Sequence, residues 1–260
     1  MQLNPMAIIF ISFLFGCTNS QSQQQDAGHS QESNDFPGNP YASIGQIPTP
    51  IGFERKKDSA TSFSLWLQNL PLKKDKTVFL FNGTPKTNQA AQYAVLDIPV
   101  GTQDLQQCAD AVMRLRASYL FDRGQYDSIV FVDNEQKAYR FTAPYSRDHL
   151  DSYLQQVFGM CGTASLSKQL KQVPDLTDIK PGDVFIRGGF PGHAVMVVDM
   201  AIDKKSAKRF LLAQSYMPAQ DIHLLVNLMD NTLSPWYAIP TGTKLFTPEY
   251  TFTTDELKGW

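Results

Sequence analysis

Residues 181–199 constrain the fold of this 260-residue chain more than any other segment. The segment begins with a Pro-Gly-Asp turn, continues through the apolar residues 184–186, and then enters a glycine-rich turn. His193 follows that turn and opens a run of alanine, valine and methionine. The pattern predicts two neighbouring strands joined by a short connection. It places one histidine at the start of the second strand, where a rigid backbone can hold an imidazole beside an open side.

The remaining segments predict an α+β fold in which a mainly antiparallel sheet packs against helices. Helical spacing of apolar residues is expected in four segments: 61–70, a helix capped by Thr102 and ending before Gly124, 147–158 and 163–172. Strands are expected at 77–81, 93–98, 128–132, 138–142, 183–187, 193–200 and 209–215, with further short strands in 236–252. The apolar run after His193 predicts a central strand that is covered on both faces.

The N-terminus predicts an exported, anchored protein. Residues 6–15 form an apolar run of signal-peptide length, and Leu-Phe-Gly-Cys at 14–17 resembles a bacterial lipobox. We expect 1–16 to be a signal peptide, 17–40 to hold a lipidated Cys17 and a disordered tether, and 41–260 to fold as one globular domain. A secretion signal with a chance cysteine is the alternative. The expected location is the cell envelope, on the periplasmic face of the outer membrane.

Composition limits the partners. The net charge of −2 gives no reason to expect nucleic acid as a partner, and no apolar run is long enough to span a bilayer. The four histidines are widely scattered, so neither a metal nor another cofactor is expected. The membrane, reached through the lipid, is the expected partner.

Two cysteines compete for the role of nucleophile. Cys108 lies about one to two turns into the second expected helix, where the pKa-lowering effect of the helix dipole fades. Cys161 precedes another expected helix start, where the dipole would lower the pKa of a thiol more. We favour Cys108, because its surroundings in the sequence are richer in polar residues. Cys108 can instead be a small buried apolar residue, since its spacing with Leu105 and Val112 fits a core face. A Cys108–Cys161 disulfide is the third alternative in an oxidising compartment.

A histidine such as His193 that acts as a general base needs a partner that orients its second ring nitrogen. The strand after the one that begins at His193 ends in Gln214 and Ser215, so an antiparallel pairing brings one of them level with the imidazole. The glutamine carbonyl can accept the ring proton without adding charge. Further polar residues are candidates for binding substrate, namely Asp110, Arg187, Ser215 and Tyr216.

The order of these elements resembles the NlpC/P60 and CHAP cysteine peptidases, which are papain-like enzymes that cut peptide bonds in bacterial cell walls. The likeness rests on the cysteine of the helix, the Pro-Gly-Asp turn, the strand that begins with His193 and the polar end of the next strand. It implies a papain-like core with Cys108 as nucleophile, His193 as base and Gln214 as the orienting group.

A closer likeness covers almost all of the mature chain. The Gln-Cys-Ala-Asp helix, the residues 181–195 and the segment Leu-Ala-Gln-Ser-Tyr-Met-Pro-Ala-Gln are similar to a family of bacterial lipoproteins defined by domain of unknown function 4846. This resemblance implies a lipoprotein and no particular activity.

The residues and the resemblance together predict a lipid-anchored cysteine hydrolase of the cell envelope. We expect an amidase or peptidase that acts on cell-wall peptides. The alternative is a non-catalytic envelope lipoprotein that binds a peptide or glycan in the same cleft.

Overall fold

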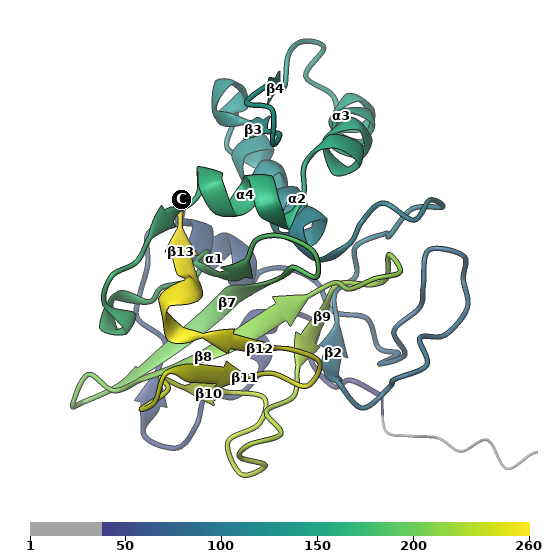
Figure 1. The fold of residues 1–260 in the computed structure, drawn as a ribbon. Coiled ribbons are helices and arrows are strands. Elements are labelled where there is room, and N and C mark those ends of the chain that lie inside the picture. The colour runs from purple at the N-terminus through teal and green to yellow at the C-terminus, as the bar shows by residue number, and fades with distance from the viewer. Residues whose placement is uncertain (1–37) are drawn as a thin grey trace, which may run out of the picture. The chain divides into compact units, whose positions relative to one another are not determined.

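The computed structural model describes residues 38–260, and the expected signal peptide, Cys17 and most of the tether lie outside these residues. Within them, nine strands form one sheet whose central path runs β2-β9-β8-β7-β6-β13-β5 (Figure 1). All pairings in the sheet are antiparallel, including those of β1 with β7 and β10 with β8. The expected α+β class with a mainly antiparallel sheet is therefore confirmed.

The helices are α1 (Phe63–Gln68), α2 (Cys108–Asp122), α3 (Arg147–Met160) and α4 (Thr163–Gln169). The strands of the sheet are β1 (Phe53–Glu54), β2 (Gln92–Val95), β5 (Lys171–Gln172), β6 (Val184–Arg187), β7 (His193–Asp203), β8 (Lys208–Gln214), β9 (His223–Leu225), β10 (Tyr237–Ala238) and β13 (Leu257–Gly259). Two separate hairpins pair β3 (Val130–Val132) with β4 (Ala138–Arg140) and β11 (Lys244–Phe246) with β12 (Thr251–Thr253).

Strand β7 is central and is buried on both faces, as its apolar run predicted. Side chains alternate along a strand, and Ala194, Met196 and Val198 join one core cluster while Val195 and Val197 join the other. All five are at most 1% exposed. Burial of each larger side chain contributes roughly 1.5–3 kcal/mol, so this strand is held firmly between two layers.

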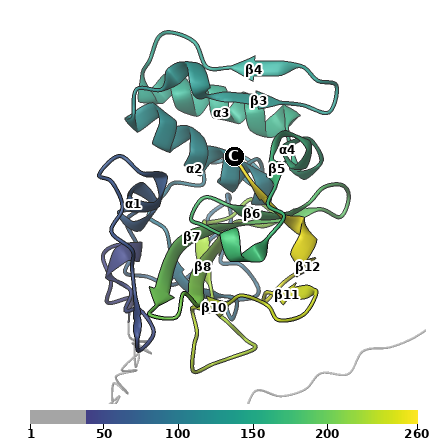
Figure 2. The ribbon, with the colours of Figure 1, turned by 90° about the vertical axis from the view of Figure 1, so that its left-hand side faces the viewer.

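The two faces of the sheet have different covers. Helices α1 and α2 pack against β7 and α4 packs against β6, so the helices cover one face. The β11–β12 hairpin contacts β6 and covers the other face with Phe252 and Leu245 (Figure 2). We call these the helix face and the hairpin face.

Some expected elements are wrong or shifted. Residues 77–81 do not form a strand of a ladder, because the chain there makes only isolated bridges, Phe79 to Pro85 and Leu80 to Gln220, around the turn at Asn82. Strands β1, β9 and β13 were not expected, and β5 occupies residues 171–172, which were expected to end the helix 163–172. No helix among residues 38–260 is both long enough and apolar enough to cross a membrane.

Candidate active site

Helix α2 begins at Cys108, later than the cap expected at Thr102. Gln107 is the N-cap residue, and its backbone N–H donates to Asp110 Oδ2 over 2.9 Å. This hydrogen bond across the first turn satisfies an amide that the helix itself cannot pair, so it defines the start of the helix. The thiol therefore lies at the positive end of the helix dipole rather than one to two turns inside.

Cys108 lines a cleft of about 290 Å³ between the start of α2, the α3–α4 junction and the turn before β7. The cysteine is 6% exposed. Burial raises the pKa of its thiol to about 11, and the charge of Asp110 adds to this effect. The backbone amides of Ala109, Ala194 and Cys108 itself lower the pKa. Since Ala194 follows His193, the sulfur lies against the first residues of β7.

His193 is fixed by Gln214 across the β7–β8 pair. The ring Nε2 lies 2.8 Å from Gln214 Oε1, and the histidine is 1% exposed. Its position in the alternation of β7 puts the ring on the hairpin face, where it contacts Tyr250 and Phe252 with ring centroids 5.0 and 5.8 Å away. Burial lowers the pKa of His193 to about 4, although the hydrogen bond with Gln214 raises it.

The partners of Gln214 determine which ring nitrogen of His193 holds the proton. Gln214 Nε2 donates to Glu249 Oε2 over 2.7 Å, and a carboxylate only accepts, so the amide oxygen of Gln214 must face His193. His193 Nε2 therefore donates its proton to that oxygen. The other nitrogen, Nδ1, is left with a lone pair and can act as a base. Lys86 Nζ anchors Glu249 over 2.5 Å in an ion pair that is largely buried.

His223 is a second buried histidine in this network. It is fully buried on β9 next to Gln214. Its Nδ1 donates to the carbonyl of Asp221 over 2.9 Å, which leaves Nε2 to accept from Gln214 Nε2 at 3.3 Å. Burial lowers the pKa of His223 to about 4. The amide of Gln214 is thus held from two sides.

Cys108 contacts the backbone of Ala194, the residue after His193, whereas the His193 ring is on the hairpin face. Within residues 38–260 no hydrogen bond joins Cys108 to this ring. The cleft is lined by Cys108 and Gly192, whereas His193 and Gln214 are not among its lining residues. Both pKa shifts favour the uncharged forms, so the resting pair is a thiol and an imidazole. Hydrogen bonds of catalytic groups are commonly longer in the free enzyme than in complexes.

Asp110 is in the cleft with Cys108, as a substrate-binding residue would be. It is 5% exposed, and its Oδ1 has no hydrogen-bond partner. Burial raises the pKa of this carboxyl to about 8, although the Gln107 amide and the charge of Arg114 lower it. At neutral pH the carboxyl is therefore largely protonated and can donate a hydrogen bond into the cleft.

The other residues expected to bind substrate lie outside this cleft. Arg187 pairs with Glu256, whose Oε2 is 2.9 Å from Arg187 Nη2. Ser215 is fully buried, with its Oγ 2.9 Å from the carbonyl oxygens of Gln106 and Gln220. Tyr216 lies against the imidazole, with the ring centroids 4.7 Å apart.

Cys161 lines the same cleft as Cys108, and both thiols are free, so the structure has no disulfide between them. Gly192 is closely packed, and a side chain would not fit at this position. A Cβ there would collide with Thr163 Oγ1 and lie 2.5 Å from the carbonyl of Gly189. The glycine is needed because α4 approaches the backbone closely at this point.

Comparisons with known proteins give a family but no characterised relative. The model of the family called domain of unknown function 4846 matches residues 45–143 and 132–259. No curated protein and no solved structure matches the chain. The two matched segments together span most of the chain, so the resemblance to the family defined by this domain is confirmed. The chain belongs to the family defined by domain of unknown function 4846.

Proposed function

We propose that this protein is a cysteine hydrolase in which Cys108 attacks an amide carbonyl and His193 serves as its base. The observation that carries the proposal is the position of the thiol, at the first residue of α2, in a cleft, and beside the strand that begins with His193. A papain-like core is part of this proposal. The fixed tautomer of His193 supports it, because Nδ1 is left free to accept a proton.

The reaction starts from neutral groups. His193 Nδ1 takes the thiol proton as the sulfur attacks the carbonyl carbon and forms a C–S bond. The unpaired amides of the first turn of α2 stabilise the developing oxyanion, and protonated Asp110 can donate a further hydrogen bond. The imidazolium then gives its proton to the leaving amine as the C–N bond breaks. Water, deprotonated by His193, cleaves the thioester and restores the thiol.

The lining of the cleft indicates the substrate. Phe190, Met160 and Met217 line it and are 99%, 51% and 49% exposed, which gives the entrance an apolar rim. Among the residues the structure describes, Asp104 is the only charged side chain of its lining, since Asp110 is largely protonated, and neither lysine nor arginine lines it. This chemistry favours a neutral or cationic amide that carries an apolar side chain. We propose a cell-wall peptide of that kind as substrate.

The location follows from the N-terminal sequence. We propose that Cys17 carries the lipid and holds the domain at the membrane, in the cell envelope. An outer-membrane anchor that faces the periplasm would bring the cleft of Cys108 to the cell wall.

A non-catalytic role is the second candidate, and one observation favours it. His193 does not line the cleft and its pKa is lowered by burial, so the cleft can hold a peptide or glycan without any reaction. In that case the apolar rim is the binding surface and the thiol is a buried packing residue.

The test is amide hydrolysis by the mature protein, with peptides released from purified cell wall as substrate and new amino groups as the readout. We expect Cys108→Ala to abolish the activity and Cys161→Ala, the matched cysteine in the same cleft, to keep it. Equal activity of Cys108→Ala and wild type would contradict the proposal. Binding of the peptides without hydrolysis, unchanged in Cys108→Ala, would establish the non-catalytic role instead.

A further inference from the structure

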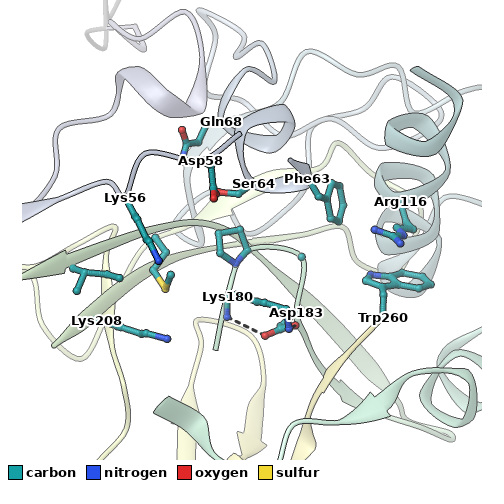
Figure 3. Close-up of a pocket in the computed structure, with 14 residues that line it drawn as sticks. Lys56, Asp58, Phe63, Ser64, Gln68, Arg116, Lys180, Asp183, Lys208 and Trp260 are labelled. Carbon is teal, nitrogen blue, oxygen red and sulfur yellow. Dashed lines mark hydrogen bonds and ion pairs between the residues drawn. The ribbon is translucent and has the colours of Figure 1, made fainter. Parts of the chain in front are cut away.

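A second and larger cavity, of about 590 Å³, lies between α1, α2, β7 and the Pro181–Gly182–Asp183 turn (Figure 3). It shares no lining residue with the cleft of Cys108. Its volume is in the range of sites for small organic ligands. The proposed hydrolase chemistry does not use it.

Arg116 of α2 forms one end of this cavity. Its guanidinium carbon lies 5.2 Å from the ring centroid of Trp260, 5.3 Å from that of Phe63 and 5.6 Å from that of Tyr119. Figure 3 shows Arg116 beside Trp260 with Phe63 close by. Among residues 38–260, no carboxylate lies within ion-pair distance of this arginine. The aromatic rings therefore hold a planar cation whose charge no ion pair with residues 38–260 compensates.

Two further features show that polar groups at this end of the cavity lack a partner within residues 38–260. Burial lowers the pKa of Arg116, which means that the charged guanidinium is held at a cost in solvation. The indole Nε1 of Trp260 is buried and has no acceptor in the described part of the chain. A buried donor and a half-buried cation next to each other are the groups that an oxyanion satisfies together.

The far side of the cavity is also positive. Lys56, Lys180 and Lys208 line it, and only Asp58 and Asp183 supply negative charge there. Lys180 pairs with Asp183 over 2.9 Å, as the dashed line in Figure 3 marks. Lys56 has no ion-pair partner among residues 38–260.

Apolar side chains form part of the wall of the cavity. Phe63, Pro181, Met200 and Ile202 line it together with the arginine and the lysines. A simple inorganic anion would leave this wall uncovered. An apolar ligand without charge would leave the guanidinium unpaired.

We propose that this cavity binds an organic anion whose apolar body packs against Phe63 and Met200 and whose carboxylate or phosphate pairs with Arg116 and Trp260 Nε1. The guanidinium donates in a bidentate manner to two oxygens of the anionic group. The lysines at the other end favour a ligand with further negative charge. Aromatic carboxylates and phosphate esters both belong to this class of organic anion.

The test is calorimetric titration of the mature protein with phenyl phosphate and with benzoate, and benzyl alcohol is the uncharged control. We expect at least one anion to bind and the alcohol not to bind. Arg116→Gln should weaken anion binding by at least about tenfold. Arg123→Gln removes the same charge from the exposed end of α2, outside the cavity, and should leave binding within about twofold. Binding of phenyl phosphate alone would assign a phosphate ester, and binding of benzoate a carboxylate.

A measurement on the unmodified protein makes the result independent of how Arg116→Gln folds. In a ¹⁵N-labelled sample, the indole N–H resonance of Trp260, identified with Trp260→Phe, should move downfield when the anion is added, because that N–H gains an acceptor. Absence of binding by both anions would overturn the proposal. So would equal affinity of Arg116→Gln and wild type, or a Trp260 signal that does not move at saturation.

Discussion

At the scale of single residues, the buried thiol of Cys108 should stay protonated at neutral pH. Burial and Asp110 raise its pKa to about 11, so the thiolate fraction grows about tenfold for each pH unit between 7 and 10. We expect the rate of alkylation of Cys108 by iodoacetamide to rise in the same proportion, measured by peptide mass spectrometry. A rate that is already constant at pH 7 would show a preformed thiolate and would contradict this description of the site.

The two buried histidines make stability depend on pH in one direction. Burial lowers the pKa of His193 and of His223 to about 4, whereas unfolded histidine takes up a proton near pH 6.5. Between about pH 4 and pH 6.5, the unfolded state therefore binds more protons than the folded state does. Their contribution to stability is complete above about pH 6.5 and is lost as the pH falls toward 4.

The comparison of wild type with His223→Gln measures this effect. Between pH 7 and pH 5, urea unfolding should show that wild type loses up to about 2 kcal/mol more stability than the variant, because only wild type has the second histidine to protonate. Identical losses would mean that His223 titrates normally in the folded protein.

How much of the site the sequence predicts depends on the distance between its residues along the chain. The contact between His193 and Gln214 could be expected, because adjacent antiparallel strands bring their ends together. Their catalytic roles stay predictions. Glu249 and Lys86, which fix the amide of Gln214, could not be found, because they lie in distant loops without a local pattern.

At the scale of elements, the close approach of α4 to the turn before β7 should make Gly192 intolerant of a side chain. Gly192→Ala puts a Cβ against Thr163 Oγ1 and two backbone carbonyls, so we expect a loss of about 1–3 kcal/mol in the free energy of unfolding. Gly159→Ala is the matched control: it lies in α3 with nothing within 4 Å of the new Cβ, and it should gain about 0.5–1 kcal/mol. Chemical denaturation measures both. Equal stability of the two variants would contradict the packing described for this turn.

The start of α2 shows what limits prediction of elements. Thr102 and Asp104 look like a cap and a first turn, yet the helix begins six residues after Thr102 because Gln107 and Asp110 close the turn. Helix propensity alone does not show which of two acceptable N-cap residues, Thr102 or Gln107, begins the helix. Long segments with clear periodicity, such as α3 and β7, were found with small shifts at their ends.

At the scale of the whole molecule, the hairpin face protects the imidazole. Phe252 of β12 is fully buried, and its ring centroid lies 5.8 Å from that of His193. Phe252→Ala should lower the free energy of unfolding by about 3–5 kcal/mol. It should also shift the pKa of His193 upward toward 6.5, because water reaches the ring. Nuclear magnetic resonance titration of the ring protons tests this, and an unchanged titration midpoint in a folded variant would contradict the role of the hairpin.

The general architecture could be read from the sequence, because the continuous apolar runs at 184–186 and 194–198 indicate strands of a sheet with two covered faces. The sequence does not show which segments cover these two faces. The β11–β12 hairpin and β13 return to the sheet through contacts with β6, which are far from them in the chain. Such pairings depend on the complete fold and have no local signature.

The central claim, that Cys108 and His193 act as nucleophile and base, is tested most directly by acyl transfer from p-nitrophenyl acetate, followed by peptide mass spectrometry. The account predicts that Cys108 is acetylated at least about tenfold faster than Cys161, and that His193→Gln slows Cys108 by about a hundredfold without affecting Cys161. Equal, slow acetylation of the two cysteines that His193→Gln leaves unchanged would contradict it.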